Sequence, residues 1–269
     1  MSDVLAGNIW LVGCGNMGGA MLRRWVESDI NPSRIIVIDP GAPAVPRGVR
    51  LMAAPPPDEV PATVVLAVKP QQLRAVSAAI GAQVAGTPLM LSILAGVEEA
   101  VLYESFGAQV VVRAMPNLPV SIGKGVVALH SESNDPRIRR IAEQLVGPLG
   151  LVEWIAEERL FDAVTALSGC GPGFLFRFID ALAEAGAALG LPADQAQRLA
   201  IATVEGSGLL AAQADVSPAV LADRVASPGG STREGLNVLD RDDALKRLLT
   251  ATLAASDARN RAMAAEARG

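Results

Sequence analysis

The 269-residue sequence predicts an α/β chain, with a doubly wound parallel sheet followed by an all-helical domain. Short apolar segments alternate with helical patterns over the first half, as in a sheet covered by helices on both faces. A G-x-G-x-x-G segment at residues 13–18 joins the first apolar segment to the first helix. From about residue 158 the strand pattern ends and long alanine- and leucine-rich segments follow. The glycine segment makes the expected sheet Rossmann-type.

The first half is expected to alternate strands with helices. The strands are continuously apolar segments at 9–12, 35–38, 64–68, 89–93, 110–113 and 126–129, as expected where both faces of a sheet are buried. Helices are predicted at 16–28, 71–79 and 97–103. A further helix is expected to be capped by Asp135 and to begin with Pro136.

The second half is expected to be helical, with breaks at 190–192, 217–218 and 227–231. The expected domains are 1–157, which binds a dinucleotide, and 158–269, which binds substrate and dimerises. A monomeric helical core is the simplest alternative, but about 110 residues of helices rich in small side chains would make a thin core, which favours an intertwined homodimer. One apolar helix face is formed by Phe174, Leu175, Phe178, Ile179, Leu182 and Leu189.

Composition restricts the partners and the compartment. The net charge of −5 and the scattered arginines give no reason to expect a nucleic-acid or anionic-membrane partner. Only two cysteines occur, Cys14 and Cys170, which excludes a disulfide framework and indicates a reducing compartment. No signal peptide is visible at the N-terminus, and the longest uncharged run, 75–97, is interrupted by glycines and a proline. A cytoplasmic protein is expected.

The glycine loop predicts dinucleotide binding because it follows a strand and opens a helix. Gly13 permits a tight turn, Gly15 lets a pyrophosphate approach the backbone, and Gly18 permits close packing of helix on strand. Asn16 and Met17 complete the loop at the helix start.

Polar residues follow three of the predicted strands. Asp39 can accept hydrogen bonds from an adenosine ribose and repel a 2′-phosphate, or it can cap the turn before Pro40. Its nearest downstream cations are Arg47 and Arg50. Lys69, before Pro70, lies at a strand end where ligands of such sheets bind, although a surface lysine is the simpler interpretation. Asn117, between two prolines, could hold a nicotinamide amide or stabilise a turn.

A second glycine-rich segment, Ala226 to Leu236, resembles a carboxylate cradle. Backbone N–H groups of Gly230, Ser231 and Thr232 would converge at a helix start, where the helix dipole favours an anion. The alternative is a capping box, because Ser231 and Glu234 have the S-x-x-E spacing. Capping does not explain the glycine pair at 229–230. Two glycines cost backbone entropy on folding, and a close approach to a ligand would justify that cost.

Metal chemistry is not expected. His130 is the only histidine, and the sequence contains no H-x-x-x-H or C-x-x-C pattern. A hydroxy-acid dehydrogenase of the His–Asp type would have to use His130, which the sequence predicts to be an exposed turn residue.

Together these segments resemble pyrroline-5-carboxylate reductases. The matching segments run in order along nearly the whole chain: GCGNMG at 13–18, AVKP at 67–70, SILAGV at 92–97, RAMPN at 113–117, ALSGCGP at 166–172 and residues 221–240. The most specific of them is Ser-Pro-Gly-Gly-x-Thr at 227–232.

The resemblance implies reduction of 1-pyrroline-5-carboxylate to L-proline with NADH or NADPH, by a homodimer that can assemble into decamers. It implies that Ser227, Gly229, Gly230, Ser231 and Thr232 bind the substrate, with Thr232 as the catalytic hydroxyl near the ring nitrogen. It also implies that the nicotinamide half of the cofactor is lined by Ala67, Val68, Lys69, Pro70, Ala95, Gly96 and Asn117.

Two departures from the family pattern stand out. The loop after Asp39 lacks the polar and basic residues that family members use against a 2′-phosphate, and residues 171–173 read Gly-Pro-Gly. Two alternatives remain open. A β-hydroxyacid dehydrogenase would need a catalytic lysine in the helical domain, where Lys246 is the only lysine. A nucleotide-sensing protein without turnover would not need Thr232.

Overall fold

The computed structural model describes residues 7–268, so the N-terminal residues in which no signal peptide is expected lie outside the description. Its eight-stranded sheet has the order β3-β2-β1-β4-β5-β6-β7-β8, and neighbouring strands are parallel except for the antiparallel pair β6–β7. The strands are β1 (Ile9–Val12), β2 (Ile35–Ile38), β3 (Arg50–Met52), β4 (Thr63–Leu66), β5 (Leu89–Ser92), β6 (Val111–Pro116), β7 (Gly125–His130) and β8 (Gly150–Trp154). The predicted fold class is confirmed.

Two strands were not predicted. β3 is only three residues long, and none of them is fully buried. β8 is the edge strand next to β7, and its residues alternate between exposed and half-buried. Neither strand has the continuous apolar character that marks the buried central strands, because neither is covered on both faces.

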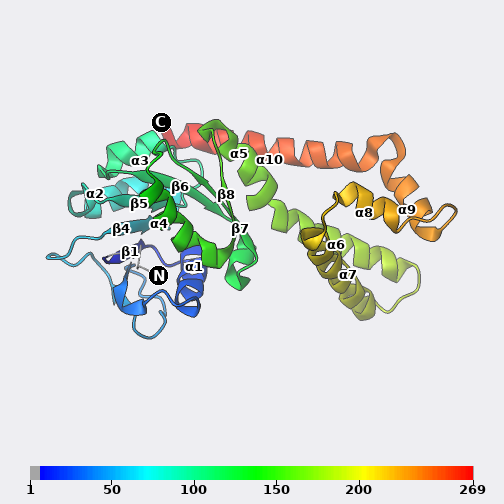
Figure 1. Ribbon diagram of the computed structural model, residues 1–269, viewed down its shortest axis with the longest axis horizontal. Coiled ribbons are helices and arrows are strands. Elements are labelled where there is room, and N and C mark those ends of the chain that lie inside the picture. Colours follow the sequence, from blue (N-terminus) through cyan, green and yellow to red (C-terminus); the bar gives the residue numbers. More distant parts are fainter. Residues whose placement is uncertain (1–6, 269) are drawn as a thin grey trace. The chain divides into compact units, whose positions relative to one another are not determined.

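Helices cover both faces of the sheet (Figure 1). α1 (Asn16–Glu27) and α4 (Pro136–Val146) pack on one face, and α2 (Leu73–Val84) and α3 (Glu99–Phe106) pack on the other. Successive residues of β1 enter the two cores in turn, Leu11 on the first face and Trp10 on the second. This two-sided burial explains why the strand sequences show no polar alternation.

Helix ends follow the expected signals within a few residues. Asp135 caps α4 by accepting the N–H of Arg137 at 2.8 Å, as predicted. Helix α2 begins later than expected, because a 3₁₀ turn occupies Pro70–Gln72. Helix α3 extends to Phe106 and ends at Gly107, which has φ +62°.

Contacts divide the chain into two compact units. Unit 1 contains the residues up to Cys170 and those from Ser256 on, and unit 2 contains Gly171–Ala255. This differs from the expected division at 157/158, because the segment after 158 packs on the sheet and the end of the last helix returns to it. Phe161 is buried, and Asn260 donates to the carbonyl of Asp162 at 3.2 Å. Short helical turns, Glu158–Leu160, α5 (Phe161–Val164) and Thr165–Gly169, form this segment.

Unit 2 is helical. It consists of α6 (Gly171–Ala188), α7 (Ala193–Gln213), α8 (Pro218–Arg224), α9 (Ser231–Asp240) and the first part of α10 (Ala244–Arg268). The expected breaks are present, since Gly190 has φ +104° and the Ser217 hydroxyl caps α8. Within residues 7–268, no helix is long and apolar enough to span a membrane.

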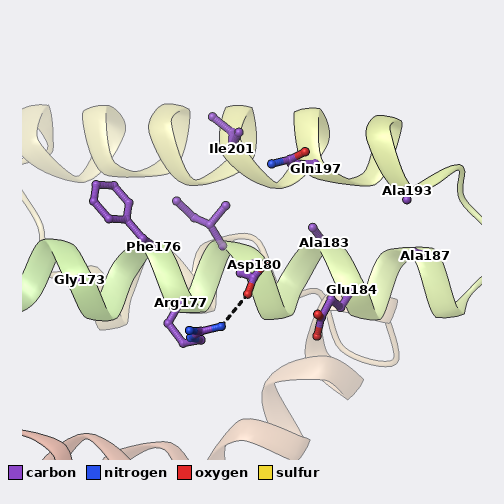
Figure 2. Close-up of a pocket in the computed structure, with 11 residues that line it drawn as sticks. Gly173, Phe176, Arg177, Asp180, Ala183, Glu184, Ala187, Ala193, Gln197 and Ile201 are labelled. Carbon is purple, nitrogen blue, oxygen red and sulfur yellow. Dashed lines mark hydrogen bonds and ion pairs between the residues drawn. The ribbon is translucent and has the colours of Figure 1, made fainter.

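The predicted apolar face of α6 is largely uncovered. Leu175, Phe178 and Leu182 keep 47%, 49% and 40% of their surface exposed. A groove of about 730 Å³ runs between α6 and α7, and Phe176 reaches from α6 toward α7 in Figure 2. Apolar side chains exposed along a helix pair mark a surface that another polypeptide covers.

Candidate functional site

The glycine loop has the geometry that dinucleotide binding requires. Gly13 has φ +89°, and a Cβ on it would lie 2.8 Å from the carbonyl oxygen of Ala67. A Cβ on Gly18 would lie 2.5 Å from the carbonyl oxygen of Gly13, so this glycine is needed for close packing. By contrast, nothing lies within 4 Å of a Cβ on Gly15. Gly15 thus leaves open space at the N-terminus of α1, where a pyrophosphate would bind.

Two further loop residues begin α1. Gly15 is the N-cap, and no side chain caps the helix. Asn16 is exposed at the first position, and Met17 is half-buried against the core on that face. The loop therefore offers uncapped N–H groups together with space, and the residues present fit a dinucleotide.

Asp39 links the end of β2 to the glycine loop. Its Oδ2 accepts the N–H of Cys14 at 2.7 Å, and its Oδ1 accepts the N–H of Gly41 at 2.8 Å. The turn-capping alternative is present, whereas a ribose contact stays a prediction. The bond to Cys14 has no signal in the sequence because the two residues are 25 positions apart. Burial, reinforced by Asp39, raises the pKa of the Cys14 thiol, which keeps it protonated.

The segment after β4 forms a wall of the glycine loop. A Cβ on Gly13 would lie 2.8 Å from Cγ1 of Val68 as well as from the backbone of Ala67. Lys69 is exposed and precedes the 3₁₀ turn that begins at Pro70. Ala67 and Val68 thus lie against the glycine loop. The roles of Lys69 and Pro70 toward a cofactor stay predictions.

The segment after β5 packs against the C-terminal helix. Gly96 has φ +71°, and a Cβ on it would lie 3.3 Å from the backbone N of Ala264. Ala95 packs against a small core cluster that includes Met115 and Phe161. This close approach accounts for a glycine at position 96.

Asn117 is 7% exposed and stabilises the turn after β6. Its Oδ1 accepts the N–H of Val126 at 2.8 Å, and its Nδ2 donates to the carbonyl of Ser168 at 3.0 Å. Of the two roles left open by the sequence, these bonds favour the structural one.

The turn that precedes α9 is built by Ser227–Gly230. Pro228 and Gly229 occupy its centre, Gly229 has φ +71°, and the N–H of Gly230 donates to the carbonyl of Ser227 at 2.9 Å. Proline followed by a residue with positive φ is the pattern of a type II turn, so the turn itself requires Gly229. A Cβ on Gly230 would lie 3.0 Å from the Ser227 carbonyl oxygen. The expectation that the Gly230 N–H is free was therefore wrong, because the turn uses it.

The start of α9 still offers three N–H groups, because that of Arg233 joins the expected Ser231 and Thr232 in place of Gly230. The N–H of Glu234 is the first to bond back, to the carbonyl of Gly230 at 3.2 Å. Within the described chain, the N–H groups of Ser231, Thr232 and Arg233 have no acceptor. The capping box does not form, because Gly230 is the N-cap and no side-chain cap is present. Thr232 is exposed. This arrangement can bind a small anion.

Arg233 is a residue that the sequence did not indicate. Its Nη2 donates to Oδ1 of Asp223 at 2.8 Å and lies 3.5 Å from the carbonyl of Ala226. These bonds tie the first turn of α9 to the end of α8. No local spacing signals the pair, because Asp223 lies ten positions earlier on another helix.

His130 is buried, not an exposed turn residue, so that prediction was wrong. It ends β7 with 2% exposure, and its Nδ1 lies 2.9 Å from the carbonyl of Ile155. Its Nε2 lies 3.8 Å from the buried Glu99. Burial raises the pKa of Glu99 to about 7. Within the described residues, no group of three or more His, Cys, Asp or Glu side chains could hold a metal ion.

The sheet, its glycine loop and the uncapped α1 define the class: an α/β protein whose first domain fits a dinucleotide. The family model for coenzyme F420-dependent NADP oxidoreductases matches residues 8–96, and that for pyrroline-5-carboxylate reductase dimerisation matches residues 158–263. The second match covers the helices with the exposed apolar faces.

Similar proteins agree with these matches. A pyrroline-5-carboxylate reductase from Synechocystis is 36% identical over 86% of this chain and 89% of its own length. The structure of one from Coxiella burnetii is 30% identical and covers 94% of this chain and 97% of its own, with a TM-score of 0.84. That of Plasmodium falciparum pyrroline carboxylate reductase with NADP bound is 25% identical over 97% and 99%, with a TM-score of 0.81.

The chain belongs to the pyrroline-5-carboxylate reductase family, an NAD(P)H-dependent family of oxidoreductases that reduce this cyclic imine to proline. The predicted family, enzyme class and cofactor type are confirmed. Membership of this family also shows that the chain binds a substrate, and the match to the dimerisation model shows that it oligomerises. The β-hydroxyacid dehydrogenase alternative finds no support, since Lys246 is exposed and pairs with Asp243 at 3.3 Å.

Proposed function

We propose that this chain reduces 1-pyrroline-5-carboxylate to L-proline, the last step of proline biosynthesis. The observation that carries this proposal is the set of three uncommitted N–H groups at Ser231, Thr232 and Arg233, which begin a helix without a side-chain cap. A carboxylate is the charged group of this substrate, and a helix N-terminus favours an anion by about 0.3–1 kcal/mol even at an exposed site.

The carboxylate cradle is proposed to hold one end of the substrate. The turn from Ser227 through Gly229 fixes Gly230 as the N-cap and so aims the first N–H groups of α9. Binding the carboxylate here orients the ring, which is the main requirement of a reaction that needs no strong base. The Thr232 hydroxyl lies on the same first turn and is proposed to orient the protonated ring nitrogen.

Dinucleotide binding is assigned to the first domain. When bound, the reduced nicotinamide supplies the hydride that the imine carbon receives. The glycine loop would hold the pyrophosphate, and Asp39 would contact the adenosine ribose. The nicotinamide half is proposed to contact the segments after β4 and β5. The full set is Gly13, Gly15, Asn16, Met17, Gly18, Asp39, Ala67, Val68, Lys69, Pro70, Ala95, Gly96 and Asn117.

The assembly is proposed to be a homodimer formed through unit 2. The apolar residues that α6 leaves exposed are the surface that a second copy would cover, and the family's dimerisation model spans them. Assembly of these dimers into decamers is proposed on the family resemblance alone. Two free cysteines are consistent with a cytoplasmic enzyme.

A direct assay tests the function. Purified full-length protein is supplied with 1-pyrroline-5-carboxylate and either NADH or NADPH, cofactor oxidation is followed by the loss of the absorbance of the reduced nicotinamide, and proline is quantified. Stoichiometric formation of proline supports the proposal. Dinucleotide binding without proline formation would favour the nucleotide-sensing alternative.

A further inference from the structure

The adenosine end of the cofactor site contains a firmly held carboxylate. Asp39 follows β2 directly, and both of its carboxylate oxygens accept backbone N–H groups, at 2.7 and 2.8 Å. One donor, Cys14, belongs to the glycine loop, so the carboxylate lies beside the proposed pyrophosphate site. In sheets of this type, the acidic side chain at this strand end faces the ribose hydroxyl to which NADPH attaches its extra phosphate.

Arg50 cannot neutralise that phosphate. It begins β3 and pairs in register with Ile36, near the amino end of β2, whereas Asp39 lies beyond the carboxyl end. Its guanidinium forms two bonds to Glu59, at 2.7 and 2.6 Å, and Asn8, just before β1, donates to the same carboxylate at 3.0 Å. The Arg50 charge is therefore held at the amino-terminal end of the strands, whereas Asp39 lies at their carboxyl end.

Arg47 also lies near the amino-terminal end of the strands. A Cβ on its neighbour Gly48 would lie 3.1 Å from the ring of Pro32, in the turn that precedes β2. The loop that leaves Asp39 has thus returned to the amino end of β2 before it reaches Arg47. Residues 40–46, which lie between them, contain no cation.

Two other cations need to be considered. Lys69 follows β4, and β1 separates that strand from β2, which puts the two strands about 10 Å apart. Arg23 extends along α1, where its Nη1 would lie 3.4 Å from a Cβ on Gly19, and its positive charge partly opposes the rise in the pKa of the Cys14 thiol. Neither bonds to the carboxylate of Asp39, whose two oxygens accept the N–H groups of Cys14 and Gly41.

From this placement we infer that the chain selects NADH over NADPH, with Asp39 as the residue that discriminates against the 2′-phosphate. The inference rests on the proposed function, because it concerns the cofactor of that reaction. A 2′-phosphate at this position would bring two negative charges together, and within the described residues no arginine pairs with Asp39 to offset them. The ribose hydroxyl of NADH, by contrast, can donate to the carboxylate.

Equilibrium binding tests the inference without turnover. NADH and NADPH are titrated separately into the full-length protein in the absence of imine, and nicotinamide fluorescence gives each Kd. A Kd for NADPH above that for NADH supports the inference, and the ratio should fall as salt rises because salt screens the repulsion. A ratio of one or less overturns it. Failure to bind either dinucleotide would instead overturn the proposed function.

Substitutions at Asp39 and at two control positions test whether Asp39 discriminates between NADH and NADPH. Asp39→Asn keeps an acceptor oxygen and removes the charge, so the ratio of the two Kd values should fall by about tenfold or more, mostly through tighter NADPH binding. Glu59→Gln removes an acid at the amino-terminal end of the strands and should leave the ratio unchanged, as should Arg23→Ala. An unchanged ratio in Asp39→Asn overturns the inference. A selective gain of NADPH affinity in Glu59→Gln, or a selective loss in Arg23→Ala, also overturns it. If Asp39→Asn does not fold, the wild-type ratio and its salt dependence decide.

Discussion

The two units bury apolar surface in different ways. Unit 1 has its own core, in which Trp10, Met21 and Trp25 are fully buried between the sheet and its helices. In unit 2, no described residue of α6 is buried, and the buried residues between 171 and 255 are Ala196, Ala200 and Ala226. Three alanines cannot stabilise about 85 residues, because each buries little apolar area. The sheet unit can fold on its own contacts, whereas the helical unit needs a partner.

The two proposed anion sites nevertheless have the same local structure. Helices α1 and α9 both begin at a glycine N-cap, Gly15 and Gly230, and neither has a side-chain cap. Helices α4 and α8, by contrast, are capped by Asp135 and Ser217. A capping side chain would occupy the N–H groups that an anion needs. Helices α2, α3 and α7 also lack side-chain caps, but they begin at Gln72, Glu98 and Pro192. A glycine start without a cap is thus what the proposed dinucleotide site and the proposed carboxylate cradle share.

Phe178→Glu should have the largest effect, because it tests the need for a partner. Placing a charge in the surface that a second copy would cover should cost about 3–5 kcal/mol per buried unpaired charge. We expect the dimer to dissociate and activity to be lost. Analytical ultracentrifugation with a parallel activity assay measures both.

The matched control is Leu151→Glu, on the exposed edge strand of unit 1. Leu151 is 57% exposed, similar to the 49% of Phe178, but it lies in the unit that has its own core. We expect this variant to keep both the dimer and the activity. If Phe178→Glu remains dimeric, the exposed α6 face is not the interface and the contrast between the units fails.

Thr232→Val sharpens the comparison by separating the hydroxyl from the N–H groups. Valine keeps the shape and the backbone N–H, but its side chain cannot donate or accept a hydrogen bond. Loss of one bond to a charged group costs about 1.5–3 kcal/mol, so kcat should fall by about tenfold or more while cofactor affinity is unchanged. Thr232→Ser should retain most of the activity. Normal turnover in the valine variant would remove the hydroxyl from the mechanism.

The sequence predicts the sheet well where burial is two-sided. The central strands could be found because every residue of β1, β2, β4 and β5 is buried. β3 and β8 could not, because short or edge strands carry polar residues that resemble loops. The prediction that His130 is exposed is wrong for a different reason. A polar residue at a strand end suggests a turn, and only the tertiary fold shows that the turn after Trp154 and α5 cover it.

The site is predictable in proportion to how local its signals are. The glycine loop and the turn at 227–230 depend on neighbouring residues, so both could be found from spacing. The capping box was a plausible alternative, and the structure excludes it because helix α9 starts one residue earlier than such a box requires. Bonds between distant residues, such as Cys14 to Asp39, have no local pattern.

Glu99→Gln tests how unit 1 tolerates a buried carboxyl in its own core. Burial raises the pKa of Glu99 from 4.5 to about 7. The hydrogen bond from the N–H of Glu132 and the charge of His130 oppose the rise, and the charges of Glu158 and Glu132 add to it. The folded chain thus binds a proton that the unfolded chain has released. This contribution to stability is complete below pH 4.5 and is lost as the pH rises through about 7.

Glutamine cannot ionise, so Glu99→Gln should raise the free energy of unfolding at pH 8 by about 1–2 kcal/mol and change it little at pH 5. Denaturant unfolding at the two pH values measures this. Glu104→Gln, at an exposed position of the same helix, serves as the control and should change neither value. Equal effects of Glu99→Gln at both pH values would show that its carboxyl does not titrate between them.

Arg233→Met should have the smallest effect and tests how the cradle in unit 2 is held. The Arg233 guanidinium ties the first turn of α9 to Asp223, and methionine keeps an unbranched apolar stem without the charge. A partly exposed ion pair contributes about 0.2–1 kcal/mol, so KM for the imine should rise by about two- to fivefold with kcat nearly unchanged. Arg233→Lys should recover part of the loss.

Arg198→Met is the matched control. It breaks the similar pair with Asp194 on α7, away from the cradle, and should leave KM unchanged. If both methionine variants raise KM equally, the effect comes from helix stability in general and Arg233 does not position the cradle.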